Sequence, residues 1–184
     1  MRINWVYANG HQIDPAVNID TIKSIGPSWG SWKTWRPCQT DNVICHDLAK
    51  CRELMQRAFQ AVCNFYIPRG FYQDLGRPLG TRLYDGDFKS DVDDIEDIIA
   101  MHLVAASSDL VLLTGFDLGA KELPADPLEK HKLKNRAGLI RSVIVGYPDV
   151  QWVLIDHATE LDVAYQNLSN LTCDSLKNVL QLLL

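Results

Sequence analysis

Short apolar runs alternate with amphipathic stretches along this chain. Runs of strand length, rich in apolar or β-branched residues, occupy 3–8, 21–25, 42–46, 62–67, 110–114 and 150–155. Apolar residues recur at helical spacing over 48–60, 92–106 and 128–145. We therefore expect strands over the first set and helices over the second. A short helical turn is expected at 71–75, a weaker strand at 81–84, and either a strand or a helix at 171–184.

Strands that alternate with helices favour a parallel sheet joined by right-handed crossovers. The pattern predicts an α/β fold, a three-layer sandwich whose mostly parallel sheet is covered on both faces. No flexible linker, low-complexity tract or internal repeat interrupts the sequence. Residues 1–184 are therefore expected to form a single domain.

The composition narrows the class of protein. Hydrophobic residues make up 47% and charged residues 22% of the chain, which is typical of a globular protein. A net charge of -5 argues against general nucleic-acid binding, which needs a basic face, although a local basic patch stays open. No apolar run approaches a membrane-spanning length, and the N-terminus does not resemble a signal peptide, so a cytoplasmic location is expected. The five cysteines contain no Cys-x-x-Cys pair and are expected to be reduced thiols.

The run from Asp109 to Gly119 predicts a buried strand that leads into Gly115-Phe116-Asp117-Leu118. Ligands of open parallel sheets bind beyond the carboxyl ends of the strands. The strand fixes the backbone of Asp117, and Gly115 lets a second group approach closely. We expect Asp117 to take part in catalysis or to bind a ribose hydroxyl, an amide or a metal. The alternative is that it caps the next segment.

A second glycine-containing segment, Gly26-Pro27-Ser28-Trp29-Gly30, follows the strand expected at 21–25. Its backbone N–H groups and the Ser28 hydroxyl could face an anion, and two strands that end in glycine suggest one shared cleft. The segment has neither the Gly-x-Gly-x-x-Gly spacing nor the Walker lysine, so it supports neither a dinucleotide dehydrogenase nor a P-loop ATPase. A plain sharp turn is the alternative.

Basic residues gather on the helix expected at 128–145, where Lys130, Lys132 and Arg136 could neutralise phosphate charge. His131 lies among them and could transfer a proton, because the ordinary pKa of histidine is about 6.5. His46 ends a predicted strand and is the second candidate for this role. Its neighbour Asp47 could line the same cleft or cap the following helix. The alternative to phosphate binding is that these cations lie on a solvated face of the helix.

An acidic run extends from Asp85 to Asp97. Its carboxylates could hold magnesium, which prefers oxygen ligands, but their spacing is not that of an EF-hand. Carboxylates in the first turn of a helix also interact favourably with its positive end. No metal ligand is therefore assigned, and magnesium stays open. The acidic run and the basic helix could also meet across a homo-oligomer interface.

The segments Gly26-Pro27-Ser28 and Gly115-Phe116-Asp117-Leu118 resemble the motifs of a Rossmann-like group that includes 6-hydroxymethylpterin pyrophosphokinase-like proteins and certain bacterial sialyltransferases. Their order and separation are also similar, over about residues 20–120. The resemblance implies a Rossmann-like fold in which both motifs hold a nucleotide, and a transferase activity. The chain departs from the group at Ile25 and at His46-Asp47, where the group has a small residue and an asparagine. It is also short for a complete sialyltransferase.

Together these features predict a protein that binds a nucleotide or a nucleotide sugar as donor and transfers a glycosyl or phosphorus-containing group. A non-catalytic protein that senses or sequesters a nucleotide is one alternative. A protein-interaction module is another, because Trp29, Trp32 and Trp35 concentrate indole rings in one segment. Those rings could contact a partner, stack on a base or sugar, or cover the sheet.

Overall fold

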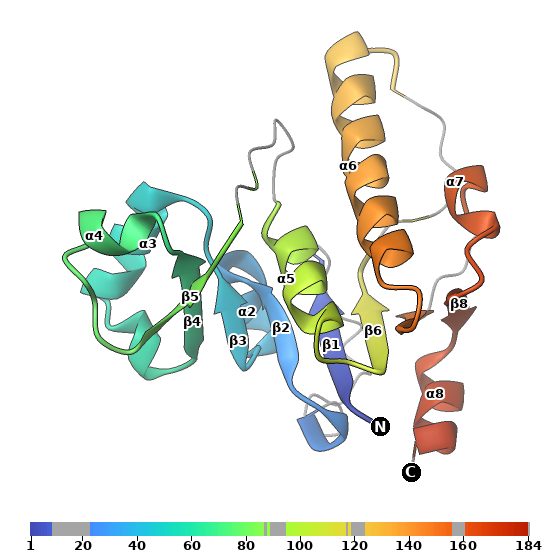
Figure 1. Cartoon of the computed structure of the whole chain (residues 1–184), viewed down its shortest axis with the longest axis horizontal. Helices are drawn as coiled ribbons and strands as arrows, with labels where there is room; N and C mark the ends of the chain where they lie inside the picture. Colours follow the sequence, from blue (N-terminus) through green and yellow to red (C-terminus); the bar gives the residue numbers. More distant parts are fainter. Residues whose placement is uncertain are drawn as a thin grey trace.

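A computed structural model describes residues 1–8, 23–86, 88, 95–116, 118, 124–155 and 161–183. Within these residues, eight parallel strands form one sheet in the order β5-β4-β3-β2-β1-β6-β7-β8 (Figure 1). The strands are β1 (Ile3–Tyr7), β2 (Ser28–Ser31), β3 (Asn42–Ile44), β4 (Asn64–Pro68), β5 (Thr81–Tyr84), β6 (Leu110–Thr114), β7 (Gln151–Ile155) and β8 (Leu171–Asp174). The α/β fold with an all-parallel sheet confirms the expected class.

Helices cover both faces of this sheet. The helices are α2 (Trp32–Cys38), α3 (Leu48–Gln56), α4 (Phe71–Asp74), α5 (Glu96–Ala105), α6 (Pro127–Gly146), α7 (Val163–Gln166) and α8 (Leu176–Leu183), with a 3-10 turn η1 at Phe59–Ala61. The layer of α5 and α6 buries one set of strand residues, whereas α3 and α8 cover the opposite face. The result is the three-layer arrangement typical of a Rossmann-like sandwich.

Alternate residues of each strand enter opposite layers, as the two-residue period of a strand requires. On β1, Val6 packs in the cluster that contains α5, whereas Trp5 packs with Val179 of α8. The central pair of strands is in register from Ile3 opposite Leu110 to Tyr7 opposite Thr114. Because both faces are covered, the central strands are almost continuously apolar, which is why their sequence signal is strong.

The prediction of a strand at 21–25 is wrong. Residues 23–25 are helical, residues 21 and 22 lie outside the described residues, and the strand in this part of the chain is β2, which begins at Ser28. A side chain at Gly26 would bring its Cβ to 2.2 Å from the carbonyl oxygen of Ile3. The glycine therefore allows the chain to pass close to β1 before β2 starts.

Other boundaries also differ from the expectation. The helix expected at 92–106 begins at Glu96, although residues 91–94 are outside the described part of the chain. The helix expected at 48–60 ends at Gln56, and Ala58 adopts a left-handed conformation before η1. The ambiguous segment 171–184 contains both structures, since β8 is followed directly by α8. Among the described residues, no helix combines the length and apolar character needed to cross a membrane.

Candidate functional site

The strand order reverses between β1 and β6. From β1 the chain builds the sheet outward to β5, and from β6 it builds outward to β8 on the other side. Ile25, in the connection from β1 to β2, packs in the layer of α8, whereas α6, which connects β6 to β7, packs in the opposite layer. Neighbouring strands thus send their connections to opposite faces. In sheets of this type, ligands bind at the carboxyl ends of the two strands that flank such a switch point.

The carboxyl end of β6 carries two features suited to a ligand. The backbone N–H of Ala8 donates to the carbonyl of Thr114 at 2.9 Å, which ties the ends of β1 and β6 together. The Thr114 hydroxyl oxygen is buried and has no hydrogen-bond partner among the described residues. Gly115 follows with a φ of 74°, a conformation that glycine adopts without strain. Buried polar atoms are normally paired, so an unpaired hydroxyl at this position is unusual.

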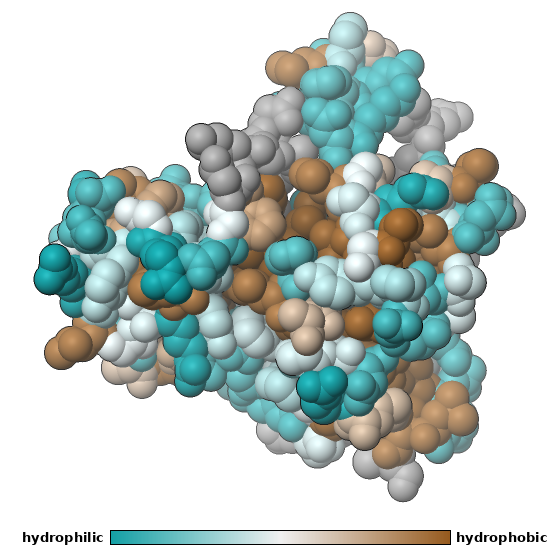
Figure 2. All heavy atoms as spheres, viewed as in Figure 1, coloured by the Kyte–Doolittle hydropathy of each residue, from teal (hydrophilic) through white to brown (hydrophobic). Residues whose placement is uncertain are grey.

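Three residues of the Gly-Phe-Asp-Leu motif are described. Gly115 makes the turn, while Phe116 and Leu118 are buried at 3% and 1% exposure in the core beside α5. Asp117 lies outside the described residues. Figure 2 shows hydrophobic side chains gathered at the surface over α5 and over the part of α6 nearest the sheet. Phe116 and Leu118 therefore supply apolar packing at the switch point rather than polar contacts.

Two carboxylates enter this end of the molecule from the first turn of α5. Glu96 is 7% exposed and Asp97 is fully buried. Nη2 of Arg136, on α6, donates to Oδ2 of Asp97, and the Arg136 side chain is 23% exposed. The ion pair joins the two helices of one layer and compensates one buried charge with another. Arg136 is thus already engaged with a carboxylate.

His46 and Tyr84 meet at the ends of β3 and β5. Nδ1 of His46 lies 2.7 Å from the Tyr84 hydroxyl, and the two rings are stacked. Burial, and then the neighbouring thiols and Glu96, raise the pKa of Tyr84 above its ordinary value. The phenol is therefore protonated at neutral pH and can donate to Nδ1, which leaves the proton of a neutral imidazole on Nε2.

The other predicted cations lie on the part of α6 that projects past the carboxyl edge of the sheet (Figure 1). Lys130 is exposed, and Nζ of Lys132 is 3.5 Å from Glu129. His131 is exposed too, with Nε2 3.0 Å from the amide of Asn135. His131 precedes Arg136 by five residues, which places it about 7.5 Å further out along the helix axis. The basic helix is confirmed, but only the part of α6 nearest its C-terminal end lies at the sheet.

Gly26, Pro27 and Ser28 lie at the opposite edge of the sheet from Gly115. Gly26 contacts Ile3, the first residue of β1, whereas Gly115 follows the last residue of β6. Five residues of strand separate the two levels, about 16 Å at 3.3 Å per residue. The expectation of one cleft lined by both glycine segments is therefore wrong. Its cause is that the Gly-Pro-Ser turn precedes a strand instead of following one.

Ser28 and Asp47 have local structural partners. The Ser28 hydroxyl donates to Oδ2 of Asp41 at 2.7 Å and accepts from the Asp41 backbone N–H at 3.0 Å. Asp47 is exposed and caps α3, where Oδ1 accepts from the backbone N–H of Lys50 at 2.7 Å. The capping alternative for Asp47 is confirmed. These bonds direct neither the Asp47 carboxylate nor the Ser28 hydroxyl to the switch point.

The three tryptophans of the 29–35 segment do not share a surface. Trp29 donates from Nε1 to Oδ1 of Asn4 and packs in the layer of α5, whereas Trp32 and Trp35 pack in the layer of α3. His102 is half-buried, and its Nδ1 lies 3.2 Å from the Tyr147 hydroxyl. No cluster of three or more His, Cys, Asp or Glu side chains that could hold a metal occurs within the described ranges.

The sequence patterns missed Thr114 and Tyr84. Both are the last residues of their strands, so the rule that selected Asp117 could have selected them. The partner of Arg136 was missed because Asp97 is 39 residues away in the sequence. Two residues so far apart in the sequence leave no periodic pattern from which their contact could be predicted.

Comparison with protein-family models, with curated proteins and with solved structures found no match to this chain. The fold and the geometry of the sheet edge are therefore the basis for a function.

Proposed function

We propose that this protein binds a nucleotide or a nucleotide sugar at the carboxyl ends of β1 and β6 and transfers a glycosyl or phosphorus-containing group from it. The observation that carries the proposal is the Thr114 hydroxyl, which is buried without a partner among the described residues, at the point where the strand order reverses. The fold supports a ligand at this position. The transferase activity rests on the resemblance of residues 115–118 to the pterin pyrophosphokinase-like and sialyltransferase group.

The charges here favour the sugar end of such a ligand. Glu96 and Asp97 bring two buried carboxylates to this end of α5. Carboxylates accept hydrogen bonds from hydroxyl groups and repel phosphate. We therefore place the ribose or sugar hydroxyls beside α5. The phosphates face Lys130 and Lys132, one to two turns further out on α6.

His46 is the better candidate of the two histidines for proton transfer. Tyr84 orients its ring through Nδ1, so Nε2 is held in a defined direction. His131 is exposed on α6, and its ring contacts Asn135 of the same helix, which does not fix it against the sheet. A catalytic acid or base needs a fixed position as well as a suitable pKa.

A thermal-shift screen tests binding. The probes are nucleoside mono-, di- and triphosphates and nucleotide sugars, each with and without magnesium. A ligand that binds only the folded state at a hundredfold excess over its Kd stabilises it by about 2.7 kcal/mol. We expect a selective shift with one ligand class, and Thr114→Val should weaken that ligand about fivefold, since one neutral hydrogen bond is worth about 1 kcal/mol.

Thr172→Val is the matched control, because Thr172 is an exposed residue of β8, the last strand of the sheet. It should leave affinity unchanged. A screen without any shift, or equal effects of the two variants, contradicts the proposed site. Binding without product formation across donors and acceptors would select the non-catalytic alternative instead.

A further inference from the structure

A hollow of about 300 Å³ lies at the amino edge of the sheet, on the face that α2 covers. Its lining is polar on one side and apolar on the other. The polar residues are Lys23, Gln39, Thr40 and Asp41, and the apolar residues are Trp35 and Val62. The volume is at the lower end of the range of small-molecule sites, so the hollow favours a compact ligand.

The order of the strands sets the order of these side chains along the edge. Val62 precedes β4, and Asp41 directly precedes β3. Lys23 is exposed and lies on the other side of Asp41, in the segment where Gly26 passes close to Ile3 of β1. The sheet runs β4-β3-β2-β1 in this part. Val62, Asp41 and Lys23 therefore follow one another along the hollow.

Asp41 supplies a carboxylate that the fold holds in place. Its Oδ2 accepts from the backbone N–H of Ser28 at 2.9 Å and from the Ser28 hydroxyl at 2.7 Å. Oδ1 takes no part in either bond, and Asp41 is only half-buried. A carboxylate oxygen in a fixed position can accept a short, strong hydrogen bond from an ammonium group.

Gln39 brings a second polar side chain to the hollow. It follows the last residue of α2 with a φ of 45°, and its backbone N–H donates to the Trp35 carbonyl at 2.6 Å. This left-handed conformation is unfavourable for a residue that has a side chain, and strain of this kind recurs at ligand sites. Gln39 is exposed, so its amide can reach a bound molecule.

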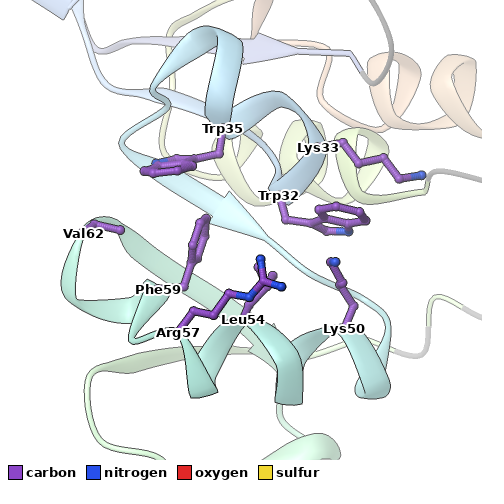
Figure 3. A pocket seen from close by; sticks show the side chains of 8 residues that line it. All are labelled: Trp32, Lys33, Trp35, Lys50, Leu54, Arg57, Phe59 and Val62. Atoms are coloured by element: carbon purple, nitrogen blue, oxygen red, sulfur yellow. The ribbon is translucent and has the colours of Figure 1, made fainter.

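The apolar end of the hollow continues into a groove between α2 and the α3–η1 segment (Figure 3). The hollow and this groove share Trp35 and Val62. Figure 3 shows Phe59 pointing toward the Trp35 ring, and the two ring centroids are 4.8 Å apart. Val62 is 63% exposed and leaves an apolar surface open beside them. This end of the hollow therefore offers apolar contacts to a ligand.

We infer that the hollow binds the zwitterion of a free apolar amino acid, such as phenylalanine. The ammonium group of the ligand meets Asp41, and its carboxylate meets Lys23. Its side chain lies against Trp35 and Val62. The lining contains one cation and one carboxylate, so a ligand with a single charge is repelled by one of them, whereas a zwitterion is attracted by both. The site is separate from the one at Thr114, which ends β6 at the carboxyl edge of the sheet.

The test is a titration of L-phenylalanine by calorimetry into the full chain and two variants. Lys23→Gln should weaken binding about fivefold, because an exposed ion pair with the ligand carboxylate is lost. Lys177→Gln makes the same change at an exposed position on α8 and should alter affinity less than about twofold. Circular dichroism verifies that both variants fold. Equal affinities for the two variants, or no heat with L-phenylalanine at millimolar concentration, overturn the inference.

Analogues of the ligand test each contact without a change at Asp41, which also binds Ser28. N-acetyl-L-phenylalanine lacks the ammonium group and should bind at least about tenfold more weakly than L-phenylalanine. L-phenylalaninamide lacks the carboxylate, so it should bind Lys23→Gln no more weakly than the wild type. Full affinity of the acetylated compound, or a fivefold loss with the amide in Lys23→Gln, contradicts the assigned contacts and overturns the inference.

Two controls define the ligand class and the site. Glucose that binds more tightly than L-phenylalanine would replace the inference with a sugar site. Thr114→Val should leave the binding of L-phenylalanine unchanged, which separates failure of this site from failure of the one at β6.

Discussion

The two edges of the sheet use polar side chains differently. At the amino edge, bonds run from strand to strand: Asn42 donates to the Ser28 carbonyl at 3.1 Å, and Asn64 donates to Oδ1 of Asn42 at 3.1 Å. At the carboxyl edge, Arg136 and Asp97 join two helices, and His46 meets Tyr84 from another strand. The polar bonds named at the amino edge therefore join neighbouring strands, whereas those at the carboxyl edge also join the helices of one layer.

Two hydroxyl groups, one at each edge, show this difference. Ser28 both donates and accepts with Asp41, so its hydroxyl is occupied by the fold. Thr114 has no such partner among the described residues, although its hydroxyl oxygen is buried. A polar group that the fold does not satisfy is more informative about function than one that resembles a binding motif.

The largest expected effect comes from the ion pair of the carboxyl edge. Asp97→Asn removes the anionic partner of a cation that is 23% exposed. We expect the free energy of unfolding to fall by about 3 kcal/mol, because loss of one partner leaves a largely buried charge. Urea denaturation measures it. Asp109→Asn, in the exposed pair with Arg2 at the amino edge, is the control and should barely move the midpoint. Equal midpoints for the two variants would remove the distinction between the edges.

The second effect is a loss of stability at alkaline pH. Tyr165 donates to the carbonyl of Ala137 and anchors α6, and burial raises its pKa to about 12. The folded state therefore keeps this proton beyond the ordinary pKa of tyrosine, about 10. Stability from Tyr165 is complete below pH 10 and is lost as the pH rises towards 12, by at most about 2 kcal/mol. Tyr165→Phe should flatten the dependence of urea midpoints on pH over this window; an unchanged slope would assign the loss to other groups.

The smallest effect concerns the amino edge. Ser28→Ala removes the hydroxyl shared with Asp41 and should cost about 1.5 kcal/mol, the usual contribution of a hydrogen bond to a charged group. Its affinity for any ligand found in the thermal-shift screen should equal that of the wild type. Calorimetry measures the affinity of the variant and of the wild type for that ligand. A tenfold weaker affinity would restore the Gly26-Pro27-Ser28 turn as a ligand site.

The secondary structure of segments with a clear pattern of apolar residues could be predicted from the sequence. The strand expected at 110–114 is β6 without any shift, because its first four residues are buried and apolar. The basic helix expected at 128–145 differs from α6 by one residue at each end. In contrast, β2 was missed, since Ser28, Gly30 and Ser31 have weak strand propensity. Its pairing with β1 and β3 overrides that propensity.

The amino-acid sequence by itself determined the alternation of strands and helices, and with it the parallel α/β fold. The reason is that the spacing of apolar residues indicates whether one or both faces of an element are buried. Only the tertiary structure decided to which edge each motif belongs. The start of β2 at Ser28 moves the Gly-Pro-Ser turn to the amino edge. The pairing of Arg136 with Asp97 was also decided there, since charges on separate helices meet only after the layers pack.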